Sequence, residues 1–229
     1  MVHLIPFKSY TFKLFCRVRL FVVALLYFCT ATVTVYAEWY VGGYGGISNP
    51  GALSNVSLSD PTLAGGVINA RMNDLELKGG LMGGAKGGYF FEGRPWLGIE
   101  TDVFTATPNV KTQTVVGGTS AGRIFADNLS QVSLRVTTWT ANIIIRSPSM
   151  SDVFQPYGGM GYGIFFATSS NVQLSPGLNV FAGARYVLSP NWALFGEFKY
   201  NHATIRFSDI RGNYETQLFV FGLMWHFDK

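Results

Sequence analysis

Three residues near the C-terminal end of the chain have the side-chain types of a nucleophilic catalytic triad. His202 and Thr204 lie two positions apart, and Glu215 follows thirteen residues after the histidine. An imidazole oriented by a carboxylate can accept the proton of a hydroxyl group, whose oxygen then attacks an acyl carbon. Histidine and threonine are also ordinary residues where a strand leaves an apolar environment, and the residues around this set match no hydrolase motif. We therefore expect no catalytic residues, and we keep His202, Thr204 and Glu215 as an alternative.

Other chemistry has no visible motif in the sequence. The chain contains no P-loop, no dinucleotide-binding fingerprint, no HExxH zinc motif, no Gly-x-Ser-x-Gly elbow and no EF-hand loop. Its two cysteines, Cys16 and Cys29, both lie in the first 37 residues. The remaining chain thus has neither a disulfide nor a thiolate metal site. We expect no cofactor and no metal.

Residues 1–37 have the composition of a cleavable signal peptide. An apolar run at 20–28 follows a basic start, and the segment ends in small residues at positions 35 and 37. This order predicts export and cleavage before Glu38. A retained N-terminal anchor helix is the alternative; a lipid anchor on Cys29 is rejected because the large Phe28 precedes it. The basic residues of the segment are Lys8, Lys13, Arg17 and Arg19.

The rest of the chain, 38–229, is electrically balanced and apolar. Four of the 17 basic residues belong to the predicted signal, which leaves 13 against 13 acidic residues. The net charge of +4 therefore gives no reason to expect nucleic-acid binding. The whole chain is 48% hydrophobic and 13% charged, which excludes disorder. No uninterrupted apolar stretch of about 18 residues follows position 37, so no helical membrane span is expected there.

Segments rich in Val, Ile, Thr and aromatic residues predict eight β-strands. Most are 10–15 residues long, longer than the usual strand of a soluble protein, and a tilted transmembrane strand needs about 9–11. The predicted strands are 38–47, 77–91, 96–107, 131–145, 153–168, 177–188, 192–206 and 214–227.

The connections between these strands alternate in length. Short turns are expected at 92–95, 147–152 and 189–191, and longer polar loops at 48–76, 108–130, 169–176 and 207–213. Short turns on one side and longer loops on the other are typical of an outer-membrane barrel. The predicted fold is all-β: one domain at 38–229, an eight-stranded antiparallel up-and-down transmembrane β-barrel preceded by the signal peptide.

Charged residues within the strands fall on one face, while the other face is largely apolar. A Lys or Arg facing lipid at the membrane midplane costs about 2–4 kcal/mol, so we expect these charges to lie in the lumen. We expect Lys86 to pair with Glu100 or Asp102, and Arg185 with Glu197, with Lys199 nearby. The expected role is structural, with a proton- or ion-conducting path as the alternative. A soluble β-sandwich or lipocalin-like barrel is the competing fold, and it would turn the apolar face inward.

Aromatic residues gather near the strand ends that the short turns join. Aromatic rings anchor a barrel at the membrane interface. We expect this role, rather than ligand stacking, for Trp39, Trp96, Trp192, Trp225 and Phe227.

Several segments resemble the OmpA-like/opacity-type outer-membrane β-barrel family. Residues 38–46 (EWYVGGYGG) are similar to its first strand and 156–163 (PYGGMGYG) to its fifth. Residues 181–200 are similar to its sixth and seventh strands. Residues 219–227 resemble its closing strand, whose terminal aromatic residue is the signal for the barrel-insertion machinery; Asp228-Lys229, which follow here, depart from that pattern.

The resemblance implies location in the outer membrane of a Gram-negative-type bacterium, with outer-membrane lipid and lipopolysaccharide as partners. Members of the family include structural barrels, adhesins, surface antigens and small porin-like proteins. We expect a non-enzymatic surface protein whose loops 48–76 and 108–130 contact a host or environmental ligand. A porin-like conduit is the first alternative. The second is a lipid A deacylase, because His202, Thr204 and Glu215 resemble the His-x-Ser and later Glu of those enzymes, with Thr in place of Ser.

Overall fold

The computed structural model describes residues 38–58, 70–118, 124–147, 153–168, 172–207 and 210–227. The predicted signal peptide, 1–37, lies outside the described residues. In the described part of the chain, no helix has the length and apolar character needed to cross a membrane.

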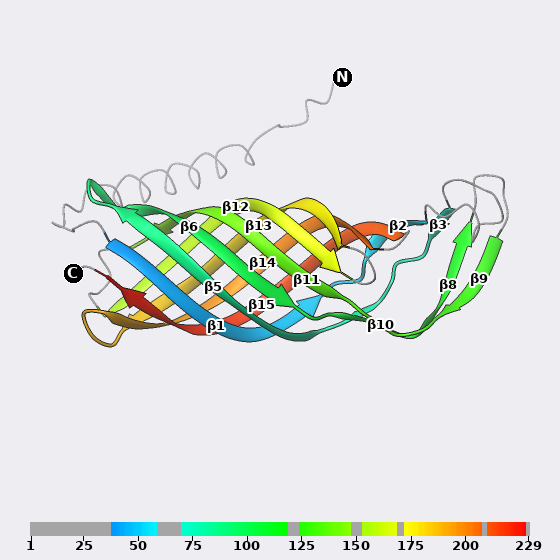
Figure 1. Ribbon diagram of the computed structural model, residues 1–229, viewed down its shortest axis with the longest axis horizontal. Helices are drawn as coiled ribbons and strands as arrows, with labels where there is room; N and C mark the ends of the chain where they lie inside the picture. Colours follow the sequence, from blue (N-terminus) through cyan, green and yellow to red (C-terminus); the bar gives the residue numbers. More distant parts are fainter. Residues whose placement is uncertain are drawn as a thin grey trace, which may run out of the picture.

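Eight long strands form a closed antiparallel barrel (Figure 1). Each strand pairs with the next barrel strand along the chain, and the barrel closes between the first and the last, from Tyr40 opposite His226 to Pro50 opposite Thr216. The predicted eight-stranded barrel is confirmed. Its strands are β1 (Glu38–Pro50), β5 (Gly80–Phe91), β6 (Arg94–Ala106), β11 (Arg135–Arg146), β12 (Phe154–Thr168), β13 (Val172–Val187), β14 (Trp192–Phe207) and β15 (Ile210–His226).

The two long predicted loops, 48–76 and 108–130, contain strands of their own. The N-terminal part of β15, from Ile210 to Asn213, pairs with β2. The sheet then continues through β3 and β8 to β9. We call this extension of the barrel wall the distal sheet; it is at the right of Figure 1. Its strands are β2 (Ser54–Leu58), β3 (Ala70–Met72), β8 (Gln113–Gly118) and β9 (Ile124–Leu129), and a small separate sheet joins β4 (Leu77–Lys78), β7 (Asn109–Val110) and β10 (Val132–Ser133).

The two other predicted long loops are much shorter than expected. β13 already begins at Val172, and β14 and β15 reach Phe207 and Ile210, so 169–176 and 207–213 are largely strand. The polar and Gly-containing ends of these strands look like loop in the sequence because they extend beyond the apolar belt. We call this end of the barrel, which carries the distal sheet, the loop end, and the opposite end, with the 92–93 turn, the turn end.

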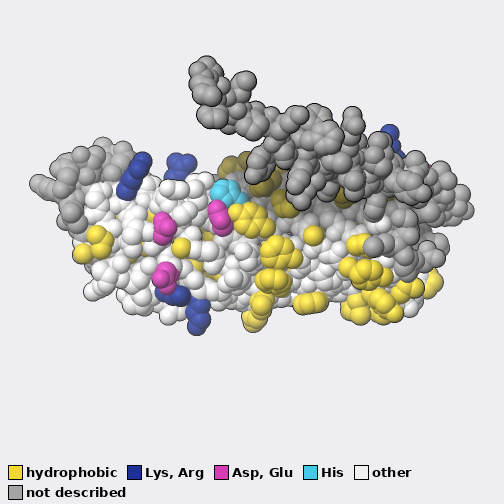
Figure 2. Space-filling view, turned by 180° about the vertical axis from the view of Figure 1, so that it is seen from behind, with side chains coloured by type: hydrophobic (Ala, Val, Ile, Leu, Met, Phe, Trp, Pro, Cys, Tyr) yellow, Lys and Arg dark blue, Asp and Glu magenta, His cyan; other side chains and the backbone are white. Residues whose placement is uncertain are grey.

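Side chains alternate between the lumen and the exterior along most of each barrel strand. Phe221 and Leu81 are each 75% exposed, whereas Lys199 and Asp102 are completely buried. On the face that Figure 2 shows, most apolar side chains gather toward the turn end, at the right, and most charged side chains toward the loop end, at the left. The competing soluble fold is therefore wrong, because it required the opposite arrangement.

Two hydrophobic clusters stabilise this architecture. One lies within the barrel and includes Tyr40, Phe90 and Phe195. The other lies at the loop end, where Leu53, Leu75 and Val115 of the connecting segments are buried with side chains of the long strands. The connections at the loop end are thus folded against the barrel mouth.

Candidate functional site

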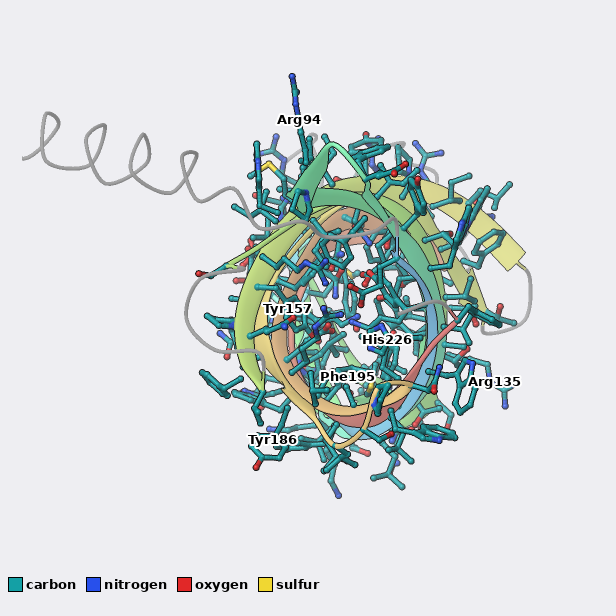
Figure 3. All side chains as sticks on the ribbon, turned by 90° about the vertical axis from the view of Figure 1, so that its left-hand side faces the viewer. Arg94, Arg135, Tyr157, Tyr186, Phe195 and His226 are labelled. Atoms are coloured by element: carbon teal, nitrogen blue, oxygen red, sulfur yellow. The ribbon has the colours of Figure 1, made fainter. Side chains whose placement is uncertain are left out.

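The lumen of the barrel is filled by side chains rather than open. In the view along the barrel from the turn end, Tyr157, Phe195 and His226 point inward, while Arg94, Arg135 and Tyr186 point away (Figure 3). An eight-stranded barrel is just wide enough for its own side chains to fill it. The buried charges among them form the first candidate site.

Two lysines connect three carboxylates in the middle of the lumen. Lys86 on β5 forms ion pairs with Glu100 on β6, at 3.3 Å, and with Glu197 on β14. Lys199 on β14 pairs with Asp102 on β6 and, at 3.2 Å, with Glu197. All five charged side chains are buried. Alternation along each strand explains this arrangement, because it places all five side chains on the inward face.

Tyrosines add a hydrogen bond to each of these carboxylates. Tyr40 donates to Glu100 at 2.8 Å, Tyr44 to Asp102 at 2.5 Å, and Tyr157 to Glu197 at 2.6 Å. Buried charge is tolerated only when it is paired and hydrogen-bonded. The three acids are therefore held by lysines and phenols together.

A second charged group lies nearer the turn end and is centred on Glu38. This carboxylate accepts hydrogen bonds from Arg146 at 2.6 Å and from Arg185 at 2.9 Å, and it lies 2.5 Å from Nδ1 of His226. Arg185 also donates to Gln155 at 2.7 Å. Both groups together contain four basic residues (Lys86, Arg146, Arg185, Lys199) and four acidic ones (Glu38, Glu100, Asp102, Glu197), so with a neutral histidine the lumen carries no net charge.

The expected lumenal residues all point inward, but one expected pair does not form. Among the described residues, Arg185 and Glu197 share no ion pair. Arg185 lies two positions closer to the turn end than the register partner of Glu197, which is Gly183, and so it meets Glu38 instead. Glu38 and Arg146 were not anticipated as members of the network. The alternation of inward and outward residues along each strand could have identified both, since both lie on the inward face of long strands.

The five aromatic residues that we predicted as anchors at the membrane interface all lie at the turn end of their strands. Trp39, Trp192 and Phe227 are about half exposed, at 56%, 43% and 52%. Trp192 and Trp225 meet edge to face with ring centroids 4.7 Å apart. Trp96 is half-buried beside the 92–93 turn. On β6, however, Trp96 shares the inward face of Glu100 and Asp102. The positions of the other four suit an interfacial anchor, and that role stays a prediction for all five.

The residues of the possible triad lie on the exterior near the loop end. His202 and Glu215 are register partners on β14 and β15, with Nδ1 and Oε1 3.3 Å apart and both side chains nearly half exposed. The hydroxyl of Thr204, however, donates to Asn213 at 3.0 Å. The structure thus brings the imidazole and the carboxylate together, while the hydroxyl proton is directed to an amide oxygen.

Among the described residues, no three His, Cys, Asp or Glu side chains are grouped to hold a metal ion.

Comparisons with known proteins agree with the architecture. A family model described as outer membrane protein beta-barrel domain matches residues 21–227. Among solved structures, Neisserial surface protein A is similar with a TM-score of 0.54 and 16% identity, over 84% of this chain and all of that one. OprG from Pseudomonas aeruginosa has a TM-score of 0.47 and 14% identity, over 86% of this chain and all of that one.

A third similar structure is Ail of Yersinia pestis, solved with the heparin analogue sucrose octasulfate. Its TM-score is 0.44 and its identity 14%, over 84% of this chain and all of that one. No curated protein matches the sequence. With a closed eight-stranded barrel, an apolar exterior and a family match over nearly the whole chain, this protein belongs to the outer-membrane β-barrel domain family and is located in the outer membrane.

Proposed function

We propose that this chain is a non-enzymatic surface protein, in which the barrel is a membrane anchor and the distal sheet is the part that binds a ligand outside the cell. The observation that carries the proposal is the buried cluster at the loop end. Leu53, Val56 and Val115 of the connecting segments are at most 5% exposed and pack with Phe165 and Ile205 of the long strands. A surface with a packed core keeps one shape, and a preformed shape lowers the entropic penalty of binding.

The filled lumen supports an anchor rather than a conduit. Four basic and four acidic side chains neutralise one another across it, and the apolar cluster covers its loop end. Moving a solute along this path would separate buried ion pairs, which costs several kcal/mol for each charge left without a partner.

The test compares the full chain with a variant in which 53–75 and 111–131 are replaced by short Gly-Ser linkers. Both are expressed in a non-adherent bacterium, and adhesion to cultured epithelial cells is counted. We expect the full chain to increase adhesion and the variant to lose that increase. Both should shift in gel mobility on boiling, which reports a folded barrel. If the variant fails to insert, excision of β8 and β9 alone replaces it. Equal adhesion by a folded variant would contradict the proposal.

A conductance measurement addresses the conduit. We expect planar bilayers containing the wild-type chain, or Glu197→Gln, to stay silent. Single-channel currents that change with Glu197→Gln would favour transport through the lumen instead.

A further inference from the structure

Three arginines lie in one row across the strands at the loop end. Arg206 on β14 is the register partner of Arg211 on β15. Arg211 is opposite Ser57 on β2, and Ser57 is opposite Arg71 on β3. Residues directly opposite in an antiparallel sheet point to the same face. All three arginines are exposed, and we call them the arginine row.

The positive charge of the arginine row has no acidic partner among the described residues. An exposed lysine of the loop end, Lys111, is by contrast paired with Glu76. Like charges directly opposite on neighbouring strands destabilise a sheet. An anion that bridges two guanidinium groups removes that repulsion and forms charge-assisted hydrogen bonds with both.

A polar cavity of about 550 Å³ lies beside the row and is lined by two of its members, Arg71 and Arg211. Ser57, Asn55 and Asn213 add hydroxyl and amide groups to its wall. Asn55 has a φ of 53°, in the left-handed region where Asn is one of the few tolerated residues.

One carboxylate, that of Asp74, also lines the cavity. It would repel an anion but can accept hydrogen bonds from sugar hydroxyls. Guanidinium groups together with amides, a hydroxyl and a single carboxylate suit a phosphorylated sugar better than a bare anion.

The row lies on the face of the sheet that contacts lipid further down. Counting along β14 in steps of two, the outward side chains run from Phe198, which is 41% exposed, through His202 to Arg206. Eight residues at about 3.3 Å per residue, in strands tilted by about 40°, place the row roughly 20 Å beyond Phe198 along the barrel axis. At that level the outward face meets the sugar headgroups of the outer leaflet, not the open medium above the barrel mouth.

We propose that the arginine row and its cavity bind the phosphorylated sugars of lipopolysaccharide. Arg71 and Ser57 belong to the distal sheet, so the site shares that sheet with any ligand it binds, but the proposal requires only that the barrel lies in the outer membrane.

The test uses the full chain, folded in mild detergent, titrated with purified rough lipopolysaccharide at fixed low salt. Arg71→Gln/Arg211→Gln is compared with Arg135→Gln, whose exposed arginine begins β11 at the loop end, outside the row. We expect at least a tenfold loss of affinity in the double variant, a change within twofold in Arg135→Gln, and a similar tenfold loss when the lipopolysaccharide is enzymatically dephosphorylated. Each variant must keep its heat-dependent gel shift; if the double variant does not, Arg206→Gln takes its place.

Several outcomes would overturn the proposal. These are unchanged affinity in the double variant, an equal loss in Arg135→Gln, and equal binding of dephosphorylated lipopolysaccharide. If millimolar inorganic phosphate displaces lipopolysaccharide completely, the site takes a free anion. If heparin binds more tightly than lipopolysaccharide, the ligand is a soluble acidic polysaccharide.

Discussion

Arg185 on β13 donates a hydrogen bond to Glu38 on β1, although the two residues are 147 positions apart in the chain. The pair lies inside the turn end of the barrel, where Glu38 also accepts from Arg146 and lies next to His226. One carboxylate therefore links β1, β11, β13 and β15. The stability of the barrel should depend on this junction more than on any exposed ion pair.

Replacing Arg185 with Met should lower the free energy of unfolding by about 3 kcal/mol, since removing one partner of a buried ion pair leaves the other without compensation. Urea titration of the barrel in lipid vesicles measures the change, with the gel shift on boiling as the readout of the folded fraction. The matched control is Arg94→Met, which removes an exposed arginine at the same end. Equal stability of the two variants would refute a structural role for the Glu38 junction.

Gly88→Ala should destabilise the barrel by about 1–3 kcal/mol, as overpacking of a filled interior does. Gly88 is the register partner of Tyr40, and a Cβ added to it would lie 2.4 Å from the Tyr40 hydroxyl oxygen. That hydroxyl holds Glu100 at 2.8 Å, so the ring has no free place to move. Gly43→Ala is the control, because a Cβ there meets nothing within 4 Å. The same urea titration should separate the two alanine variants.

Phe221→Arg should reduce stability by about 2–4 kcal/mol, the expected penalty for arginine on the lipid-facing side near midplane. Val116→Arg should have little effect, although Val116 is also an exposed apolar residue, at 49%, because it belongs to the distal sheet. Insertion yield into lipid vesicles measures both. If both variants insert equally well, the apolar belt does not face lipid.

The pKa of the Glu76 carboxyl should be lower than that of an ordinary glutamate. A hydrogen bond from Lys111, at 2.9 Å, and the positive charge of the same group lower it. Because the pKa in the folded state is below the unfolded value, the small stabilisation is present at neutral pH and is lost as the pH falls through the folded-state pKa. An NMR titration of the Glu76 side chain checks the direction, and Lys111→Met should return the pKa to its usual value. A pKa unchanged by Lys111→Met would show that the pair does not persist in solution.

His202→Ala should leave the acylation of lipid A unchanged, because the Thr204 hydroxyl is donated to Asn213 rather than to an imidazole. Mass spectrometry of lipid A from cells that express the wild-type or the variant chain measures this. The appearance of under-acylated lipid A with the wild-type chain alone would revive the hydrolase alternative.

Most of the barrel was predictable because alternation is a local property of the sequence. The inward position of Glu197 and Lys199 and the outward position of Phe219 and Phe221 follow from period-two counting within one strand. The partner of Arg185 was not predictable in this way. It depends on the register between strands and on the reach of a side chain across the lumen, which no single strand reveals.

The distal sheet was missed for a related reason. β3 has three residues, which are too few to show a periodicity, and one of its two partners, β8, is distant in sequence. Arg71 joins the arginine row only through that pairing, because Arg71 and Arg211 are both opposite Ser57 on the strand between them.

The cross-lumen ion pairs also bear on how the barrel is assembled. Lys199 reaches Asp102 over 97 residues of sequence, and Arg185 reaches Glu38 over 147. Both bonds cross the lumen, so we expect them to form only when the sheet curls toward closure. A cylinder that sealed with a strand missing, or with its seam slipped, would trap charges without counter-ions in a dry interior. We therefore expect the network to favour the correct strand number and seam over misfolded closures.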